Sequence, residues 1–158
     1  MRSTLLALVA AALVAIAVAP AGARAATCTQ SHLPLQDPNC QIGTTNPDVS
    51  QDNIGSTICV SGWTRTIRPP AEYTSSLKLE QMREYGLDGS TSGYQEDHLV
   101  SLELGGHPTD RRNLWPEPLP HAADVDRVEN ELNRKVCAGQ ITLAEGQRRE
   151  TELKHRSG

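Results

Sequence analysis

The chain has 158 residues, with 15 lysines and arginines against 19 aspartates and glutamates, and a formal net charge of −4. This acidic balance argues against a general polyanion-binding protein, because nucleic-acid-binding domains are usually basic. Aromatic residues make up 3% of the chain and phenylalanine is absent. We therefore expect a modest aliphatic core, which is marginal unless something staples the fold.

The first 25 residues have the pattern of a cleaved export signal. Arg2 precedes an almost unbroken apolar run over residues 5–18, and Ala23-Arg24-Ala25 matches a signal-peptidase site. No later stretch of the sequence is long and apolar enough to cross a bilayer. We predict a secreted protein that is cleaved after Ala25 and has no membrane segment in its mature form. An uncleaved N-terminal anchor is the alternative.

Cleavage leaves 133 of the 158 residues, enough for one domain with its own core. All four cysteines lie in this part, and the chain has no C-x-x-C pair. Export therefore favours two disulfides over a structural zinc site. Three pairings are open. We favour Cys28–Cys40, which closes a short loop, and Cys59–Cys137, which ties an early strand to a late helix.

The mature chain begins with an irregular, disulfide-tied lead segment over residues 26–53, which is rich in turn-forming residues. Residues 54–67 alternate and are rich in β-branched side chains, so they predict one strand or two short ones. Residues 73–85 predict a helix that ends at Gly86. Residues 88–93 are expected to form a flexible connector.

A hairpin over residues 94–118 is expected next, followed by a helix over residues 121–137. Acidic residues open this helix and basic residues close it, as the macrodipole favours. Thr142 and Glu145 form a capping box that opens a third helix toward residue 153, and residues 154–158 are expected to fray. This order of elements predicts an α+β fold with a single domain over residues 54–158.

The hairpin, YQEDHLVSLELGGHPTDRRNLWPEP, carries the densest group of ionisable side chains. A neutral imidazole such as that of His98 is a competent base at neutral pH. The Asp97 carboxylate beside it suits a hard divalent cation, and a base with a cation suits hydrolysis of a phosphate ester. Neighbours in a regular strand point to opposite faces, so the two converge only if the strand bends or bulges. Glu96, which shares a face with His98, is a spare candidate.

The helix over residues 121–137 is expected to supply the remaining ligands. At 100° per residue, Glu129 closely flanks its apolar stripe, and Asn133, Asp126 and Asn130 follow further round. Glu129 and Asn133 are also spaced i, i+4, so they can bind one ion from one face. These side chains are therefore candidates to meet the hairpin.

The order of these features resembles the HNH, or ββα-metal, nuclease motif: Asp-His, a glycine-containing loop, Asn-Leu fifteen residues after the histidine, and a helix. The run EDHLVSLELGG-x-P-x-D-x-x-NLWPEP is similar to a set of small exported bacterial proteins within that group. The similarity continues through ICVSGWTRTIRPP and VENELNRKVCAGQITL. It implies a small disulfide-stapled α+β domain with a ββα-metal hairpin–helix core and flanking helices.

The resemblance implies a secreted, metal-dependent endonuclease that acts on DNA or RNA, and we expect a monomer. By position, His98 matches the general base, Asp97 the carboxylate ligand, and Asn113 the asparagine that pins the loop and helps orient the histidine. The expected ion is Mg²⁺, with Mn²⁺, Zn²⁺ and Ni²⁺ as alternatives. On the helix, Glu129 and Asn130 are the predicted metal ligands. The secondary candidates are Glu96, Asp126, Asn133 and His121.

The helix departs from the HNH pattern because it has no histidine between Asp124 and Cys137. This departure and the acidic charge motivate a second hypothesis, a non-catalytic exported module on an HNH-like scaffold that binds cell-envelope material or a metal. Under that hypothesis Asp97 and His98 form a structural or surface pair. Asn113 is then an ordinary turn residue.

Overall fold

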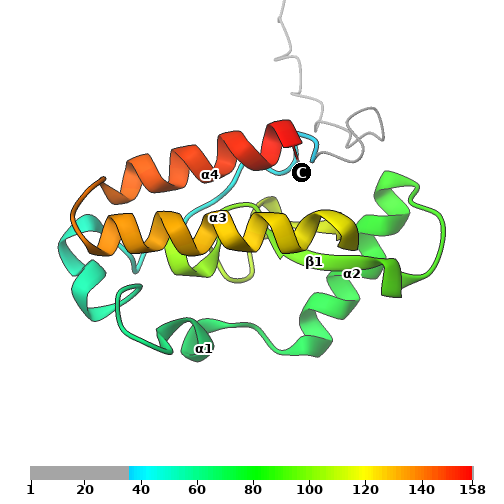
Figure 1. Ribbon diagram of the computed structural model, residues 1–158. Coiled ribbons are helices and arrows are strands. Elements are labelled where there is room, and N and C mark those ends of the chain that lie inside the picture. Colours follow the sequence, from blue (N-terminus) through cyan, green and yellow to red (C-terminus); the bar gives the residue numbers. More distant parts are fainter. Residues whose placement is uncertain (1–35, 158) are drawn as a thin grey trace, which may run out of the picture.

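A computed structural model describes residues 36–157, apart from the side chains of residues 120, 121, 123, 124 and 157. In this part of the chain two strands and four α-helices form an α+β fold, which confirms the predicted fold class. Helices α3 (Leu119–Cys137) and α4 (Leu143–Ser157) run antiparallel and side by side, and α3 packs against the hairpin (Figure 1). The hairpin consists of β1 (Tyr94–His98) and β2 (Leu114–Pro118).

The hairpin has a regular antiparallel register, from Tyr94 opposite Pro118 to His98 opposite Leu114, and it contains no bulge. The connection over residues 99–113 is a loop with two 3₁₀ turns, Leu102–Leu104 and Arg111–Asn113. The hairpin predicted over residues 94–118 therefore forms, with a short strand at each end. Because the register is regular, alternate side chains of β1 point to opposite faces.

The loop closes tightly at two glycines. Gly105 has a φ of 73°, in the left-handed region that favours glycine. A Cβ atom on Gly106 would lie 1.7 Å from the carbonyl oxygen of Val100, so no larger residue fits there without a backbone shift. The N–H of Gly106 donates to the Ser101 carbonyl at 2.9 Å, which folds the loop back on itself.

The described part of the lead segment packs onto this loop. Thr45 forms an isolated antiparallel bridge with Gly106, and the N–H of Gly43 donates to the Arg112 carbonyl at 3.1 Å. Residues 36–53 are mostly irregular, yet these bonds attach them to the body formed by the later residues.

The helix predicted over residues 73–85 is confirmed as α2 (Ala71–Tyr85), which begins two residues earlier. Gly86 follows it with a φ of 61°, the left-handed cap expected from the sequence. Helix α2 packs against both strands. At its end the Tyr85 ring meets the buried Trp115 ring edge-on, with the ring centroids 5.4 Å apart.

The two later helices are confirmed as α3 and α4, and both are longer than predicted. Helix α3 begins at Leu119, and α4 runs to Ser157. The expectation that residues 154–158 fray is wrong for Lys154, whose side chain is fully buried. Buried residues recur at regular helical spacing along one face of α4, and Lys154 continues this row. Its members are Leu143, Gly146, Glu150 and Lys154.

The strand predicted over residues 54–67 is wrong. The segment contains the end of the 3₁₀ helix Gln51–Ser56, a series of turns, and the short helix α1 (Trp63–Ile67). β-Branched residues favour strands mainly through packing on a pleated surface, and this segment pairs with neither strand of the described sheet. Its apolar side chains instead join the core cluster, where Ile58 is buried and Ile54 packs against it.

A disulfide joins Cys59 to Cys137, as predicted, with 5.6 Å between the two Cα atoms. It links the turns before α1 to the end of α3, across a sequence separation of 78 residues. A loop of this length is stabilised by about 4–5 kcal/mol in the chain-entropy description. For the predicted Cys28–Cys40 bridge, Cys40 is disulfide-bonded and Cys28 lies outside the described residues.

The main core cluster lies between the loop and the α3–α4 pair. Its buried members are aliphatic, as the composition leads us to expect: Ile58, Val100, Leu104, Leu132, Val136 and Leu143. Among residues 36–157, no helix has the length and apolarity needed to cross a membrane.

We expect Gly106→Ala to lower the free energy of unfolding by about 2–3 kcal/mol, since the new methyl group overlaps the Val100 carbonyl. The matched control is Gly93→Ala, where an added Cβ meets no atom within 4 Å. Urea and thermal unfolding of the oxidised proteins measure the difference. Equal stability of the two variants would contradict the close approach at Gly106.

Candidate functional site

The two faces of β1 carry different chemistry. The Asp97 carboxylate lies on the face toward α3 and α4, where it contacts Lys154. The ring of His98, the next residue, points away from this face and bonds the Pro108 carbonyl in the loop. Because β1 has no bulge, the structure does not bring the Asp97 carboxylate and the His98 ring onto one face.

The His98 ring is held in a defined orientation. Its Nε2 atom lies 3.1 Å from the Pro108 carbonyl oxygen, which can only accept, so Nε2 carries the hydrogen and Nδ1 the lone pair. Burial lowers the pKa of His98, and the bond to Pro108 and the charge of Asp97 offset this only in part. The ring is therefore neutral at neutral pH, with Nδ1 as its basic atom.

Asn113 fixes the loop that carries Pro108. Its side chain is fully buried, and its Oδ1 accepts a hydrogen bond from the Val100 N–H at 2.9 Å. Its Nδ2 donates to the carbonyls of Val100 and His107, at 2.9 and 3.1 Å. One side-chain amide thus joins the start of the loop to the residue before Pro108. It thereby positions the carbonyl that orients His98.

The ammonium of Lys154 lies at the centre of the opposite face. The side chain is 0% exposed, and Nζ lies 2.8 Å from Asp97 Oδ2 and 2.5 Å from Glu129 Oε1. It also donates to the His98 carbonyl at 2.5 Å. An ammonium has three N–H donors, so these three acceptors satisfy it completely. Its partners come from β1 and α3, while Lys154 itself belongs to α4.

Two further carboxyl groups lie close to this ammonium. Glu150 is 3.8 Å from Nζ, and it accepts the N–H of Ser101 at 3.0 Å. Glu117 is 0% exposed, and neither of its carboxyl oxygens finds a hydrogen-bond donor among the residues that the structure describes. With Asp97 and Glu129, four acidic side chains surround one positive charge.

One ammonium cannot keep four buried carboxyl groups ionised. Burial acts to raise the pKa of Asp97, but the charge and hydrogen bond of Lys154 outweigh it and hold that pKa below its usual value. Burial and the Asp97 charge raise the pKa of Glu117 to about 8. Burial also raises the pKa of Glu129 and of Glu150, against the opposing charge of Lys154. Lys154 and Asp97 therefore form the ion pair, and Glu117 retains a proton at neutral pH.

The other predicted ligands on α3 make different contacts. Asn130 is exposed, and its Nδ2 donates to the carbonyl of Asp126, itself exposed, at 2.7 Å. Asn133 donates to the carbonyls of Ile58 and Glu103, at 3.3 and 2.6 Å. Asn130 thus lies on the solvent side of α3. Asn133 ties α3 to the loop and to the turns before α1.

The predicted divalent ion does not fit between Asp97 and Glu129 while Lys154 lies there, because both carboxylates already bind its Nζ atom. Within the described part of the chain, no group of three or more histidine, cysteine, aspartate or glutamate side chains is arranged to hold a metal ion. The side chain of His121, a secondary candidate, lies outside the described residues. Binding of a divalent ion elsewhere on the protein stays a prediction.

Glu96 lies on the face of β1 opposite Asp97. With Lys78 it helps line a groove of about 290 Å³ between α2 and the hairpin. Both carboxyl oxygens are buried, with no hydrogen-bond partner in the described structure. Burial raises the pKa of Glu96 to about 8, although the charge of Lys78 opposes the shift. Glu96 is therefore mostly protonated at neutral pH.

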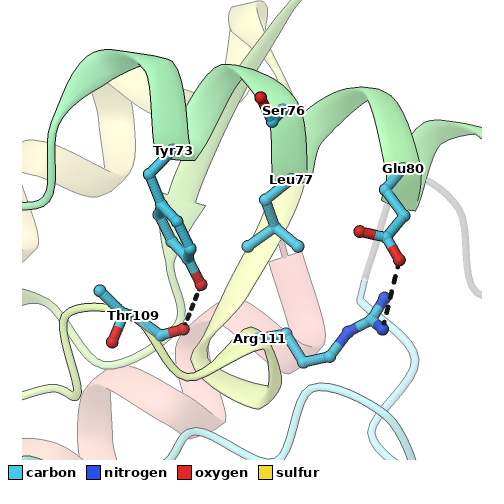
Figure 2. Close-up of a pocket in the computed structure, with 6 residues that line it drawn as sticks. All are labelled: Tyr73, Ser76, Leu77, Glu80, Thr109 and Arg111. Carbon is cyan, nitrogen blue, oxygen red and sulfur yellow. Dashed lines mark hydrogen bonds and ion pairs between the residues drawn. The ribbon is translucent and has the colours of Figure 1, made fainter.

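A second groove, of about 340 Å³, lies between α2 and the end of the loop. Figure 2 shows the Tyr73 hydroxyl donating to the Thr109 carbonyl at 2.5 Å, and Arg111 pairing with Glu80 at 3.7 Å. None of the predicted site residues lines this groove. Thr109 directly follows Pro108, however, so the bond to Tyr73 is a second anchor for the part of the loop that orients His98.

The sequence interpretation missed Lys154, Glu150 and Glu117. One signal for the first two is helical spacing, because positions 143, 146, 150 and 154 share one face of α4. A glutamate and a lysine spaced i, i+4 on an inward-facing row indicate a buried ion pair. Glu117 lies two residues after the buried Trp115 and so shares its face of β2. That alternation is a weaker signal.

No family model, no curated protein and no solved structure matches the chain at a significant level. The likeness to HNH nucleases therefore rests on the motif within the chain.

Asn113→Ala removes two buried hydrogen bonds and one partly buried one, and leaves the backbone groups of Val100 without their side-chain partner. We expect the free energy of unfolding to fall by about 2–4 kcal/mol. The control is Asn130→Ala on the exposed side of α3, for which a change within about 0.5 kcal/mol is expected. Urea unfolding of the oxidised proteins measures both values. Equal losses would show that Asn113 does not hold the loop.

The substitution Glu96→Gln tests, through the pH dependence of stability, whether the Glu96 carboxyl group is buried with a raised pKa. A carboxyl group whose pKa rises on folding from 4.5 to about 8 has no effect on stability below pH 4.5 and destabilises the fold increasingly as the pH rises toward 8. Glu96→Gln should therefore match the wild type near pH 4.5 and unfold at a higher temperature than the wild type at pH 8. The exposed Asp88→Asn is the control. A difference in melting temperature that does not change with pH would rule out the buried carboxyl group.

Proposed function

We propose that the protein hydrolyses phosphodiester bonds of nucleic acid, with His98 as the general base. The observation that carries this proposal is the neutral His98 ring, held through Nε2 by the Pro108 carbonyl so that Nδ1 bears the lone pair. A fixed tautomer with a free lone pair is what proton abstraction from an attacking water requires. The chemistry is then deprotonation of water at Nδ1, attack of the resulting hydroxide on phosphorus, and cleavage of the P–O bond to one sugar oxygen, which leaves and takes a proton from solvent.

The order of the elements supports an HNH-like core. His98 ends β1, Asn113 directly precedes β2, and α3 follows β2 without a linker. This is the arrangement of strand, loop, strand and helix that the motif implies. The Asn113 amide also bonds across the loop, which is the role that the resemblance gives to the asparagine.

A phosphate group also needs positive charge near the base. Arg68 is exposed, and its charge acts on His98, whose pKa it helps to lower. An arginine can bind a phosphate through two parallel N–H bonds. We propose that Arg68 is the first contact of the substrate phosphate. This local charge would serve a nucleic-acid substrate, DNA or RNA, in spite of the acidic chain.

The proposal keeps two further predictions from the sequence, export with cleavage after Ala25 and a secreted monomeric product, and it leaves the predicted dependence on a divalent ion to the assay. Mg²⁺, Mn²⁺, Zn²⁺ and Ni²⁺ are the ions to compare. Because the Lys154 ammonium already occupies the space between Asp97 and Glu129, a metal ion does not fit there, and no catalytic step is assigned to a metal.

A non-catalytic exported binding module is the second candidate function. The observation that favours it is the fully buried Lys154. Its ammonium binds the carboxylates of Asp97 and Glu129, which are themselves little exposed. Such a cluster stabilises a scaffold whether or not His98 has a substrate. The two functions differ in whether His98 is needed for turnover.

The test is incubation of the oxidised mature chain with plasmid DNA and with RNA, in the presence and absence of divalent ions. We expect His98→Ala to lower the cleavage rate by at least about 100-fold, which is typical for loss of a general base. The matched control is His155→Gln, which keeps a donor for the Gln41 carbonyl that His155 bonds and should retain the wild-type rate.

The pH profile adds a second readout. The rate should fall only below the ordinary histidine pKa of about 6.5, because burial lowers the pKa of His98. Absence of cleavage under every ion condition, or equal cleavage by His98→Ala, would reject the nuclease and leave the binding module.

A further inference from the structure

The environment of Lys154 is that of a bound cation. Two carboxylate oxygens, from Asp97 and Glu129, and one backbone carbonyl oxygen, from His98, surround the ammonium at 2.5–2.8 Å. Carboxylate and carbonyl oxygens from separate elements are the donors that hard divalent ions take in proteins. Here the chain places its own positive charge among them, at the end of α4.

We propose that the Lys154 ammonium is the resident cation of this site, in the position that a divalent metal ion would take between Asp97 and Glu129. The catalytic consequence rests on the proposed hydrolase function, whereas the occupancy of the site does not. A cation supplied by the chain is always present and needs no ion from solution.

The local chemistry supports a permanent occupant. The Lys154 side chain is 0% exposed, and all three N–H donors of its ammonium are hydrogen-bonded within the protein. The ammonium therefore has no free donor that could bind a ligand from solvent. Both oxygens of Glu150, a third carboxyl group near the ammonium, accept the Ser101 N–H, at 3.1 and 3.0 Å, which anchors Glu150 to the loop. A divalent ion could enter this position only by displacing the ammonium from all three of its hydrogen-bond acceptors.

Lys154 acts on the proposed reaction as a positioning residue, because its buried ammonium cannot touch a substrate. It binds the carbonyl of His98 while Pro108 binds the ring of the same residue. The base is thus held from both sides. If the proposed hydrolase is correct, its His98-dependent activity should not need a divalent ion at Asp97.

The test compares the wild type with Lys154→Met, a side chain of similar length without charge, in the full oxidised protein. Calorimetric titration with Mn²⁺ should show no binding to the wild type that depends on Asp97. Lys154→Met should gain a site for one Mn²⁺ ion, and Asp97→Asn added to that variant should abolish it. Lys135→Met, at a partly exposed lysine that pairs with Glu131, is the control and should gain no site.

Two outcomes overturn the proposal. One is Mn²⁺ binding to the wild type that Asp97→Asn abolishes, because the position would then be open to metal. The other is a folded Lys154→Met protein without new Mn²⁺ binding, because the pocket would then be an ordinary ion pair that fits no metal ion.

A measurement on the wild type alone keeps the test valid if Lys154→Met fails to fold. A buried ammonium with three hydrogen bonds exchanges its protons slowly, so Lys154 should give a ¹⁵N-edited NMR signal near neutral pH. The signal should persist, unshifted, in saturating Mg²⁺. Loss or a large shift of the signal on adding Mg²⁺ overturns the proposal.

The nuclease assay separates this inference from the proposed function. His98-dependent cleavage that changes by less than about twofold when EDTA is added supports Lys154 as the resident cation, because a metal-activated water would be lost with the metal. Cleavage that EDTA abolishes and Mg²⁺ restores overturns the catalytic consequence. Absence of any cleavage rejects the hydrolase, while the Mn²⁺ titration still decides whether Lys154 occupies the cation position.

Discussion

The buried ammonium of Lys154 determines how the parts of the site are placed. It projects from α4, and its three hydrogen bonds reach the Asp97 carboxylate and the His98 carbonyl on β1 and the Glu129 carboxylate on α3. An isolated charge in a protein interior is costly, and only pairing together with complete hydrogen bonding offsets the cost. Any shift of one element would leave part of this charge without a partner. One nitrogen atom therefore bonds the hairpin and both helices of the pair.

The same atom links the acidic cluster to His98, although the cluster and the His98 ring lie on opposite faces of β1. Lys154 holds the backbone of His98, and the loop holds its ring through Pro108. The loop is in turn positioned by Asn113, whose amide bonds Val100 near the start of the loop and His107 in its middle. The orientation of one imidazole thus depends on a salt bridge from the C-terminal helix and on an amide fifteen residues along the chain. This dependence explains why so many buried polar groups gather around a two-stranded sheet.

The sequence predicts the parts of this arrangement that depend on local chemistry. Helices α2, α3 and α4 follow from their periodicity and end signals, and the hairpin expected over residues 94–118 forms with a short strand at each end. The strand prediction for residues 54–67 is wrong because it relied on the strand propensity of β-branched residues. The observed turns instead follow from Gly62 in the left-handed region and from the disulfide at Cys59. The predicted fraying of residues 154–158 fails for a different reason. A charged residue near a chain end is usually solvated, and only the fold shows that Lys154 lies inside.

The separation along the chain also explains why Asn113 is recognisable and Lys154 is not. Asn113 belongs to the same local motif as His98, whereas Lys154 is 57 residues from Asp97. A motif identifies the carboxylates that need a cation but not the source of that cation. An ammonium carries one charge and offers only N–H donors, whereas a metal ion also has open positions for water or a phosphate oxygen. Lys154 can therefore order the carboxylates and His98 but cannot bind a substrate oxygen. In the proposed hydrolase that role is assigned to Arg68, whose charge acts on the His98 ring.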